Sequence, residues 1–268
     1  MKKLSLLFIG VALSLNASAA WHFTPYGSFT SKTKVKNSYN KASYSVYGFD
    51  AGNENFTFGY KRTTYDFDWK TTGFEHLNLI YADAHYAGEI TGNLGYDVGT
   101  YLSLGYENSI KVSKSYDLVP HAVLTYDFQN DWSMVAGAGV SFNKANNYGF
   151  GIIGFKYRNP SDLGFSASLG YPKTSANYRF TEYFALGADA GAIQGGHYYL
   201  DRSKVYAQEK GYNANLFALI TPFNQLSVKA GVGYNIDREI KFYRNRTYFG
   251  NMKFDNEASF FVNGTLAF

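Results

Sequence analysis

An acid and an imidazole stand two residues apart in the stretch "YADAH", at Asp83 and His85. Side chains two apart in a β-strand lie on the same face, so this carboxylate and this imidazole can exchange a proton. Such a pair can activate water by general acid–base catalysis. Asp83 and His85 are therefore the catalytic candidates of a hydrolase hypothesis. A hydrated lumen pair without catalytic activity is favoured over it, because no second acidic pair is evident beside these residues. The spacings HExxH and G-x-S-x-G are also missing.

A second stretch, "GFGIIG" from Gly149 to Gly154, has the spacing of a dinucleotide-binding loop. That function needs a strand before the glycines, a helix after them and an acid about twenty residues further on. Here the glycines lie inside an alternating segment that continues to Tyr157 and then turns. Glycine in a strand permits bending or makes room for neighbours. The sequence predicts no cofactor and no metal ion.

The elements around these residues are predicted to be strands. Segments of about ten residues alternate apolar residues with polar or small ones, and turn residues separate them. We predict about fourteen strands, over residues 22–32, 42–51, 54–66, 76–90, 94–108, 117–128, 131–143, 147–158, 162–171, 174–181, 183–200, 210–221, 225–242 and 254–268.

The connections between these segments alternate in length. Every second one is short, such as "AGNEN", "TGN" and "PFNQ", and most of the others are longer, such as "TKVKNSYNK" and "DRSKVYAQE". Aromatic residues make up 19% of the chain and stand beside nearly every short turn. Short turns at one rim, longer loops at the other and aromatic girdles are typical of transmembrane β-barrels. We therefore expect an all-β fold, a transmembrane antiparallel barrel of about fourteen strands, with twelve as the alternative.

The alternation assigns the charged strand residues to the lumen, because a charge facing lipid costs several kcal/mol. The predicted lumen and selectivity residues are Lys61, Asp83, Glu89, Asp97, Glu107, Asp127, Lys156, Arg179, Asp189, Lys229, Asp237 and Glu257, together with His85. Acids concentrate on the fourth to sixth predicted strands, and bases lie further around the wall. These charges either face each other across water in a channel, or pair and pack to plug a structural barrel.

The N-terminus and the overall composition indicate an exported protein. Lys2 and Lys3 precede the apolar run "LSLLFIGVALSL" and the small residues "NASAA", which together predict a signal peptide at residues 1–20. Residues 21–268 then form the barrel. The absence of cysteine excludes a disulfide framework. The charge is nearly balanced and no basic face is concentrated enough to predict a nucleic-acid partner.

The chain ends "ASFFVNGTLAF", with apolar residues at every second position before a terminal phenylalanine. With the signal peptide and the strands, this ending resembles the Gram-negative outer-membrane β-barrel proteins. The resemblance implies a location in the bacterial outer membrane, lipid contact, and an assembly signal that the barrel-assembly machinery reads, at Phe260, Val262, Leu266 and Phe268. A narrower run, "YRNPSDLGFSASLGYPKTSANYRF" with its continuation, resembles a group of uncharacterised proteobacterial barrel proteins.

Basic residues gather in the predicted long loops. Such cations can bind phosphate through charge-assisted hydrogen bonds, so contact with lipopolysaccharide is one interpretation and ordinary solvated charge is the other. The predicted contact residues are Lys32, Lys34, Lys36, Lys111, Lys114, Arg244 and Arg246, and Arg238 lies beside the last loop. The favoured function is a monomeric channel for small polar or charged solutes. The alternatives are a non-conducting structural or surface-interaction barrel and a lumen hydrolase.

Overall fold

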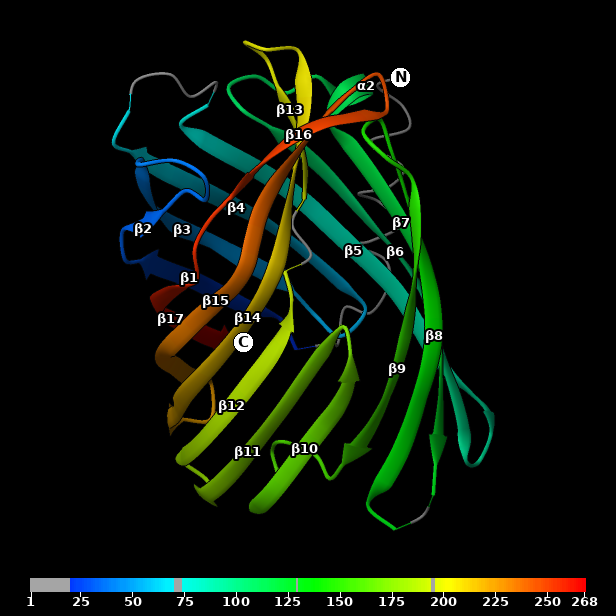
Figure 1. Ribbon diagram of the computed structural model, residues 1–268. Helices are drawn as coiled ribbons and strands as arrows, with labels where there is room; N and C mark the ends of the chain where they lie inside the picture. Colours follow the sequence, from blue (N-terminus) through cyan, green and yellow to red (C-terminus); the bar gives the residue numbers. More distant parts are fainter. Residues whose placement is uncertain (1–19, 70–73, 129, 194–195) are drawn as a thin grey trace.

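The computed structural model describes residues 20–69, 74–128, 130–193 and 196–268, and the predicted signal peptide lies outside these ranges apart from its last residue. In the described residues, fourteen antiparallel strands close into a barrel (Figure 1). They are β1 (His22–Thr30), β3 (Lys41–Gly52), β4 (Phe56–Phe67), β5 (His76–Thr91), β6 (Leu94–Tyr106), β7 (Tyr116–Asp127), β8 (Trp132–Asn143), β9 (Tyr148–Tyr157), β10 (Gly164–Tyr171), β11 (Lys173–Thr181), β12 (Phe184–Ala192), β14 (Val205–Phe223), β15 (Leu226–Arg244) and β17 (Glu257–Ala267). The predicted fold class is confirmed.

The barrel closes where the first and last strands pair. β1 and β17 are antiparallel partners from His22 opposite Ala267 to Thr30 opposite Ser259. Trp21 and Phe268 extend this pairing, because each backbone N–H donates to the other's carbonyl, over 2.9 and 2.8 Å. Closure gives each of the fourteen strands a partner on both sides along at least part of its length.

The two rims differ as the sequence predicts. Short turns join β3 to β4, β5 to β6, β11 to β12 and β14 to β15. The opposite rim carries the three remaining short strands, β2 (Thr33–Lys34), β13 (His197–Leu200) and β16 (Thr247–Lys253), and the helix α2 (Val112–Ser115). By the usual layout of such barrels the short-turn rim is periplasmic and the other extracellular.

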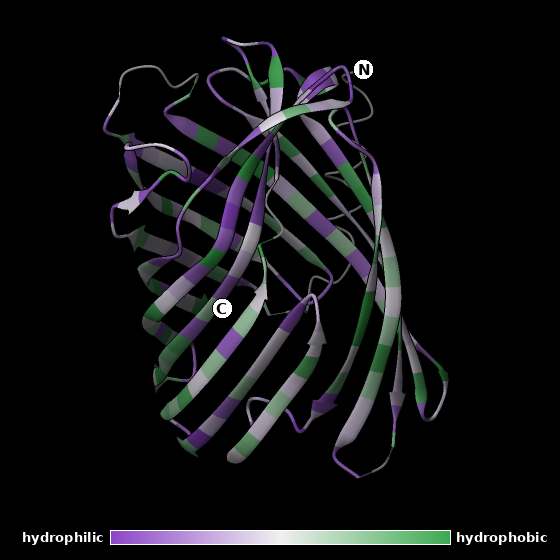
Figure 2. Cartoon of the chain, in the orientation of Figure 1, coloured by the Kyte–Doolittle hydropathy of each residue, from purple (hydrophilic) through white to green (hydrophobic). Residues whose placement is uncertain are grey.

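The outer face of the barrel is apolar. On β6, for example, Val98 and Leu102 are exposed, whereas Asp97 and Ser103 point inward. Figure 2 shows hydrophobic and hydrophilic residues alternating along the strands. A large exposed apolar surface of this kind indicates contact with lipid.

Among the described residues, no helix is both long enough and apolar enough to cross a membrane.

The extracellular half contains a packed core that the strand pattern did not predict. We expected one strand over residues 183–200, but β12 ends at Ala192 and β13 leaves the wall. β13 pairs antiparallel with β14 and parallel with β6, so it joins the two sides of the barrel. An alanine Cβ at Gly105 would lie 1.9 Å from the backbone oxygen of His197, so glycine is required for this approach.

Candidate functional site: the charged lumen

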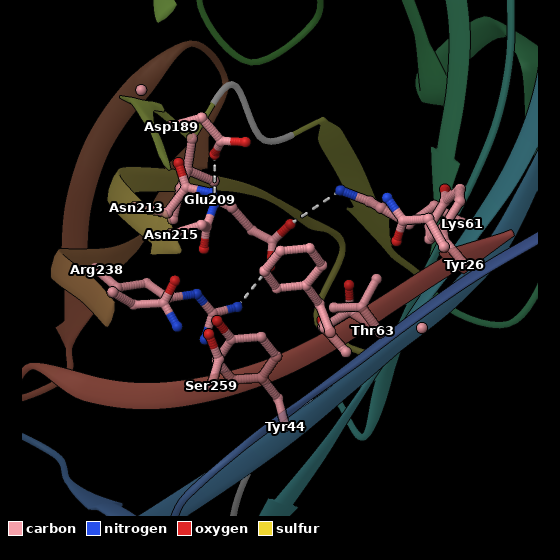
Figure 3. Close-up of a pocket in the computed structure, with 18 of the residues that line it drawn as sticks. Tyr26, Tyr44, Lys61, Thr63, Asp189, Glu209, Asn213, Asn215, Arg238 and Ser259 are labelled. Carbon is pink, nitrogen blue, oxygen red and sulfur yellow. Dashed lines mark hydrogen bonds and ion pairs between the residues drawn. The ribbon is translucent and has the colours of Figure 1, made fainter. Parts of the chain in front are cut away.

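A lumen cavity with a volume of about 570 Å³ lies between β1, β3, β4, β11, β12, β14, β15 and β17 (Figure 3). This volume lies within the range of small-molecule sites. Its charged lining comprises the basic side chains Lys61, Lys173, Lys229 and Arg238 and the acidic side chains Asp189 and Glu209. Bases therefore outnumber acids on this wall.

Asp189 of β12 is paired with Lys173 of the neighbouring strand β11 and with Lys229 of β15, the strand after β14. Lys229 Nζ lies 2.8 Å from one carboxylate oxygen, and Lys173 Nζ lies 4.0 Å from the same oxygen. The Asn215 amide donates to the other oxygen over 2.6 Å. Only 7% of the Asp189 side chain is exposed, whereas Lys229 remains 26% exposed. The lysine therefore presents charge to the cavity while the acid is buried behind it.

A second cluster surrounds Glu209 at the extracellular end of this cavity. Arg238 Nη2 donates to Glu209 Oε1 over 2.9 Å. The hydroxyls of Tyr65 and Tyr198 donate to the same carboxylate over 2.5 and 3.1 Å. Lys61 Nζ lies 3.6 Å away. Glu209 and Arg238 are 4% and 3% exposed, so this is a buried ion pair in which both carboxylate oxygens of Glu209 accept hydrogen bonds.

Arg238 is also stacked on a ring. Its guanidinium carbon lies 3.5 Å from the centre of the Tyr44 ring, a cation–π contact. Figure 3 shows Tyr44 of β3 and Arg238 of β15 reaching toward each other from two different strands.

The inward position of Arg238 corrects two expectations from the sequence. Strict alternation placed Asp237 in the lumen and Arg238 beside the last loop. In the structure, β15 has one extra residue opposite Gly211, because Tyr212 pairs with Ile236 but Lys210 pairs with Glu239. Asp237 adopts a φ of 47° at this bulge, is 74% exposed, and pairs with Lys36. A bulge reverses the inward and outward positions beyond it, so Arg238 faces inward.

The opposite wall is acidic. In the strand order, β6 and β7 lie across the barrel from β14 and β15. A cavity of about 380 Å³ at this wall is lined by Asp83, Asp117 and His121, among others. His85 Nδ1 lies 2.9 Å from Asp97 Oδ2, so the partner of this imidazole is Asp97 on β6 rather than Asp83. Asp83 and His85 share an inward face as predicted, and His85 is 31% exposed.

The remaining predicted lumen residues lie outside these two cavities. Glu89, Asp127 and Lys156 are exposed near the short-turn rim. Arg179 donates to the backbone oxygens of Pro160 and Glu182, which fixes two turns of that rim. Glu107 and Glu257 are buried at the extracellular end, 3.6 Å from Arg202 and 3.9 Å from Arg238 respectively.

The basic loop residues lie at the extracellular rim, and several have acidic partners. Lys32 pairs with Asp66, and Lys111 pairs with Asp201. Lys114 lies over the Tyr199 ring, and Arg244 lies beside the Phe249 ring. Lys34 and Arg246 are exposed.

The four predicted assembly residues all lie on β17 or directly after it. Phe260, Val262, Leu266 and Phe268 are exposed on the outer face, between 46% and 73%. Their side chains therefore lie on one lipid-facing row of the closing strand.

No protein-family description matches the chain, and no curated protein matches it in sequence. Solved structures do match in shape. An outer membrane channel from Pseudomonas putida F1 has a TM-score of 0.50 and 9% sequence identity, covering 93% of this chain and 96% of that chain. The NanC porin has a TM-score of 0.46 and 10% identity, covering 91% and 98%. At these identities the likeness shows the fold alone, which is that of outer-membrane β-barrels.

Proposed function

We propose that this protein is a monomeric outer-membrane channel for small polar or charged solutes, with the charged lumen as its filter. The observation that carries the proposal is the charge separation across the cavities. In the main cavity four bases outnumber the two acids Asp189 and Glu209. On the β5–β7 side Asp83 and Asp117 line the second cavity, and Asp97 lies beside His85 on the same wall.

This separation would create an electric field across the path of a solute. Low-dielectric walls focus such a field and raise the local concentration of charged or dipolar molecules. Lys61, Lys229 and Asp97 are between 22% and 36% exposed, so these charges reach the space that a solute would occupy.

The proposal is tested by swelling of vesicles that contain the purified barrel. We expect rapid swelling in a small neutral sugar or a small amino acid, and none in a trisaccharide, because the cavities are of small-molecule size. Vesicles with the same lipid and no protein are the control. Correctly folded barrel that admits none of these solutes would contradict the channel.

A non-conducting structural or surface-interaction barrel is the second candidate. It is supported by the core in the extracellular half, where Leu77, Tyr198 and Ile240 are fully buried between the two walls. In that case the same swelling assay gives no signal for any solute.

We also propose partners for the two ends of the barrel. The row from Phe260 to Phe268 is proposed as the segment that the barrel-assembly machinery reads. The cations Lys32, Lys34, Lys36, Lys111, Lys114, Arg244 and Arg246 are proposed to contact lipopolysaccharide phosphates. Replacing Lys34 and Arg246 by alanine should lower the lipopolysaccharide that copurifies with the barrel, and an unchanged amount would count against this contact.

A further inference from the structure

The extracellular end of the barrel is filled on the side of β3, β4 and β5. A buried apolar cluster joins the ends of these strands to β13, β14 and β15, and includes Leu77, Tyr198, Leu200, Ile240 and Phe254. Each of these side chains is at most 1% exposed. Because a packed core of this kind leaves no space larger than water, a solute cannot pass through this part of the end.

β13 is fixed in place by a buried polar network. His197 Nδ1 lies 2.9 Å from Asp117 Oδ2, and Ser141 donates to the other oxygen of Asp117 over 2.6 Å. These three residues and Asn143, which donates to Ser141 over 2.8 Å, are at most 5% exposed. A strand held on both sides of the barrel by such contacts is part of the closed end.

The barrel wall is shorter on the side formed by β10, β11 and β12. β9 pairs with β10 only from Ile153 onward, so residues 148–152 have no strand partner on that side within the described chain. β14 pairs with β12 from Tyr212 and with β13 from Gln208. The Gly211 carbonyl accepts from the Ile193 N–H over 2.7 Å, which leaves Glu209 and Lys210 between the two partner strands. Figure 1 shows the short strands β10, β11 and β12 ending well below the extracellular ends of β9 and β14.

A cavity of about 380 Å³ lies at this interruption. Tyr148, Phe150 and Tyr171 line it from the β9–β10 side, and the residues from Gln208 to Tyr212 line it from β14. It shares Ala192, Ile193 and Glu209 with the main cavity, and Tyr148 and Phe150 with the cavity at the acidic wall. The side opening therefore adjoins both halves of the charged lumen.

One contact spans this opening. Lys210 Nζ on β14 lies 5.8 Å from the centre of the Tyr148 ring on β9. Neither side chain is fully buried, and a cation–π contact at such a site contributes only about 1 kcal/mol. A contact of this strength separates readily, in contrast to the core that closes the end.

The surroundings of the opening indicate which molecules would reach it. Tyr171 and Tyr212 at its edges are exposed on the outer face, as is Phe142 on the neighbouring strand β8. Tyrosine is enriched where a protein meets the interface of a membrane, since its ring is apolar and its hydroxyl polar. The lining combines these rings with the charges of Glu209 and Lys210.

We propose that solutes enter the barrel sideways through this opening between β9 and β14, and that the preferred solutes are small amphipathic molecules with an aromatic ring and a charged group. The inference rests on the proposed channel function. The ring would contact Tyr148, Phe150 and Tyr171, and the charged group would pass on to the charged lumen. For a solute to enter, the cation–π contact between Lys210 and Tyr148 must break.

The test uses the absence of cysteine from the chain. Lys210→Cys places a single thiol at the opening, and Asn245→Cys places one at the exposed turn after β15, on top of the closed end. Each barrel is folded first and then treated with a bulky maleimide, so that the reagent cannot disturb assembly. Swelling of vesicles in phenylalanine and in serine is measured before and after labelling.

We expect labelled Lys210→Cys to lose most of its phenylalanine flux and labelled Asn245→Cys to keep it. Bridging Tyr148→Cys to Lys210→Cys with a bismaleimide should cause the same loss, whereas either single variant with that reagent should lose less. Flux that persists after labelling at position 210, or that is lost after labelling at 245, overturns the side entrance while the channel stands. A folded barrel that passes no solute before labelling overturns the channel itself, and the side entrance with it.

Discussion

Arg238→Met is the substitution that tests the buried cluster most severely. It removes the guanidinium that lies 2.9 Å from Glu209 and 2.7 Å from the Tyr65 hydroxyl, and leaves the carboxylate 4% exposed. Removing one partner of a buried pair costs about 3–5 kcal/mol, because the other charge stays buried. Lys61 at 3.6 Å and two tyrosine hydroxyls compensate in part, so we expect a loss of about 3 kcal/mol in the free energy of unfolding.

The measurement is urea unfolding of the barrel in lipid vesicles, followed by tryptophan fluorescence. Trp69 packs against the extracellular core, so its emission reports on this region. The control is Arg246→Met in the exposed turn, which should change the free energy of unfolding by less than about 0.5 kcal/mol.

The double variant Arg238→Met with Glu209→Met separates charge from packing. Replacing both charges by apolar side chains should cost less than Arg238→Met alone, since only Glu257 then loses its basic partner, whereas Arg238→Met alone takes that partner from both Glu257 and Glu209. The reasoning is refuted if Arg238→Met matches the control, or if the two substitutions simply add.

Three further predictions concern the lumen, the inward strand and closure. Asp83→Asn combined with Asp97→Asn should shift the reversal potential in a salt gradient toward anion selectivity, because two negative charges leave the acidic wall; an unchanged potential would show that they do not filter ions. Gly105→Val should push β13 from β6, cost about 1–3 kcal/mol of stability and speed trypsin cleavage after Lys204, whereas an unchanged cleavage rate would mean that the approach is not needed. Deleting Phe268 should lower the fraction of barrel that migrates as the compact form on an unheated gel, and normal assembly would contradict its role in closure.

The membrane-spanning part of the fold is predictable from sequence because lipid and water impose opposite requirements on alternate residues. The pattern from Leu226 to Ile236 predicts the inward and outward faces of β15 correctly, with Lys229 in the lumen. The pairing of β17 with β1 also follows, because an apolar alternating end needs a partner strand.

The extracellular half of the barrel could not be predicted from the alternation of residues. Beyond the bulge at Asp237 the inward and outward positions of β15 are exchanged. The sequence continues to alternate through the bulge, so the inserted residue cannot be recognised from the pattern. Residues 183–200 were expected to form one strand, yet β13 leaves the wall after β12 ends at Ala192, because β13 finds partners on β6 and β14. The local periodicity of the sequence carries no information about pairing between strands that are far apart in the chain. Glu209 was missed because it falls in a stretch, "DRSKVYAQE", that has the composition of a loop.

The proposed solute channel is tested most directly by recording the purified barrel in a planar lipid bilayer. The charged cavities on both walls predict discrete unitary current steps under an applied voltage. Barrel that is demonstrably folded and inserted, yet gives a flat current trace at every voltage, would contradict the channel and leave the structural barrel as the function.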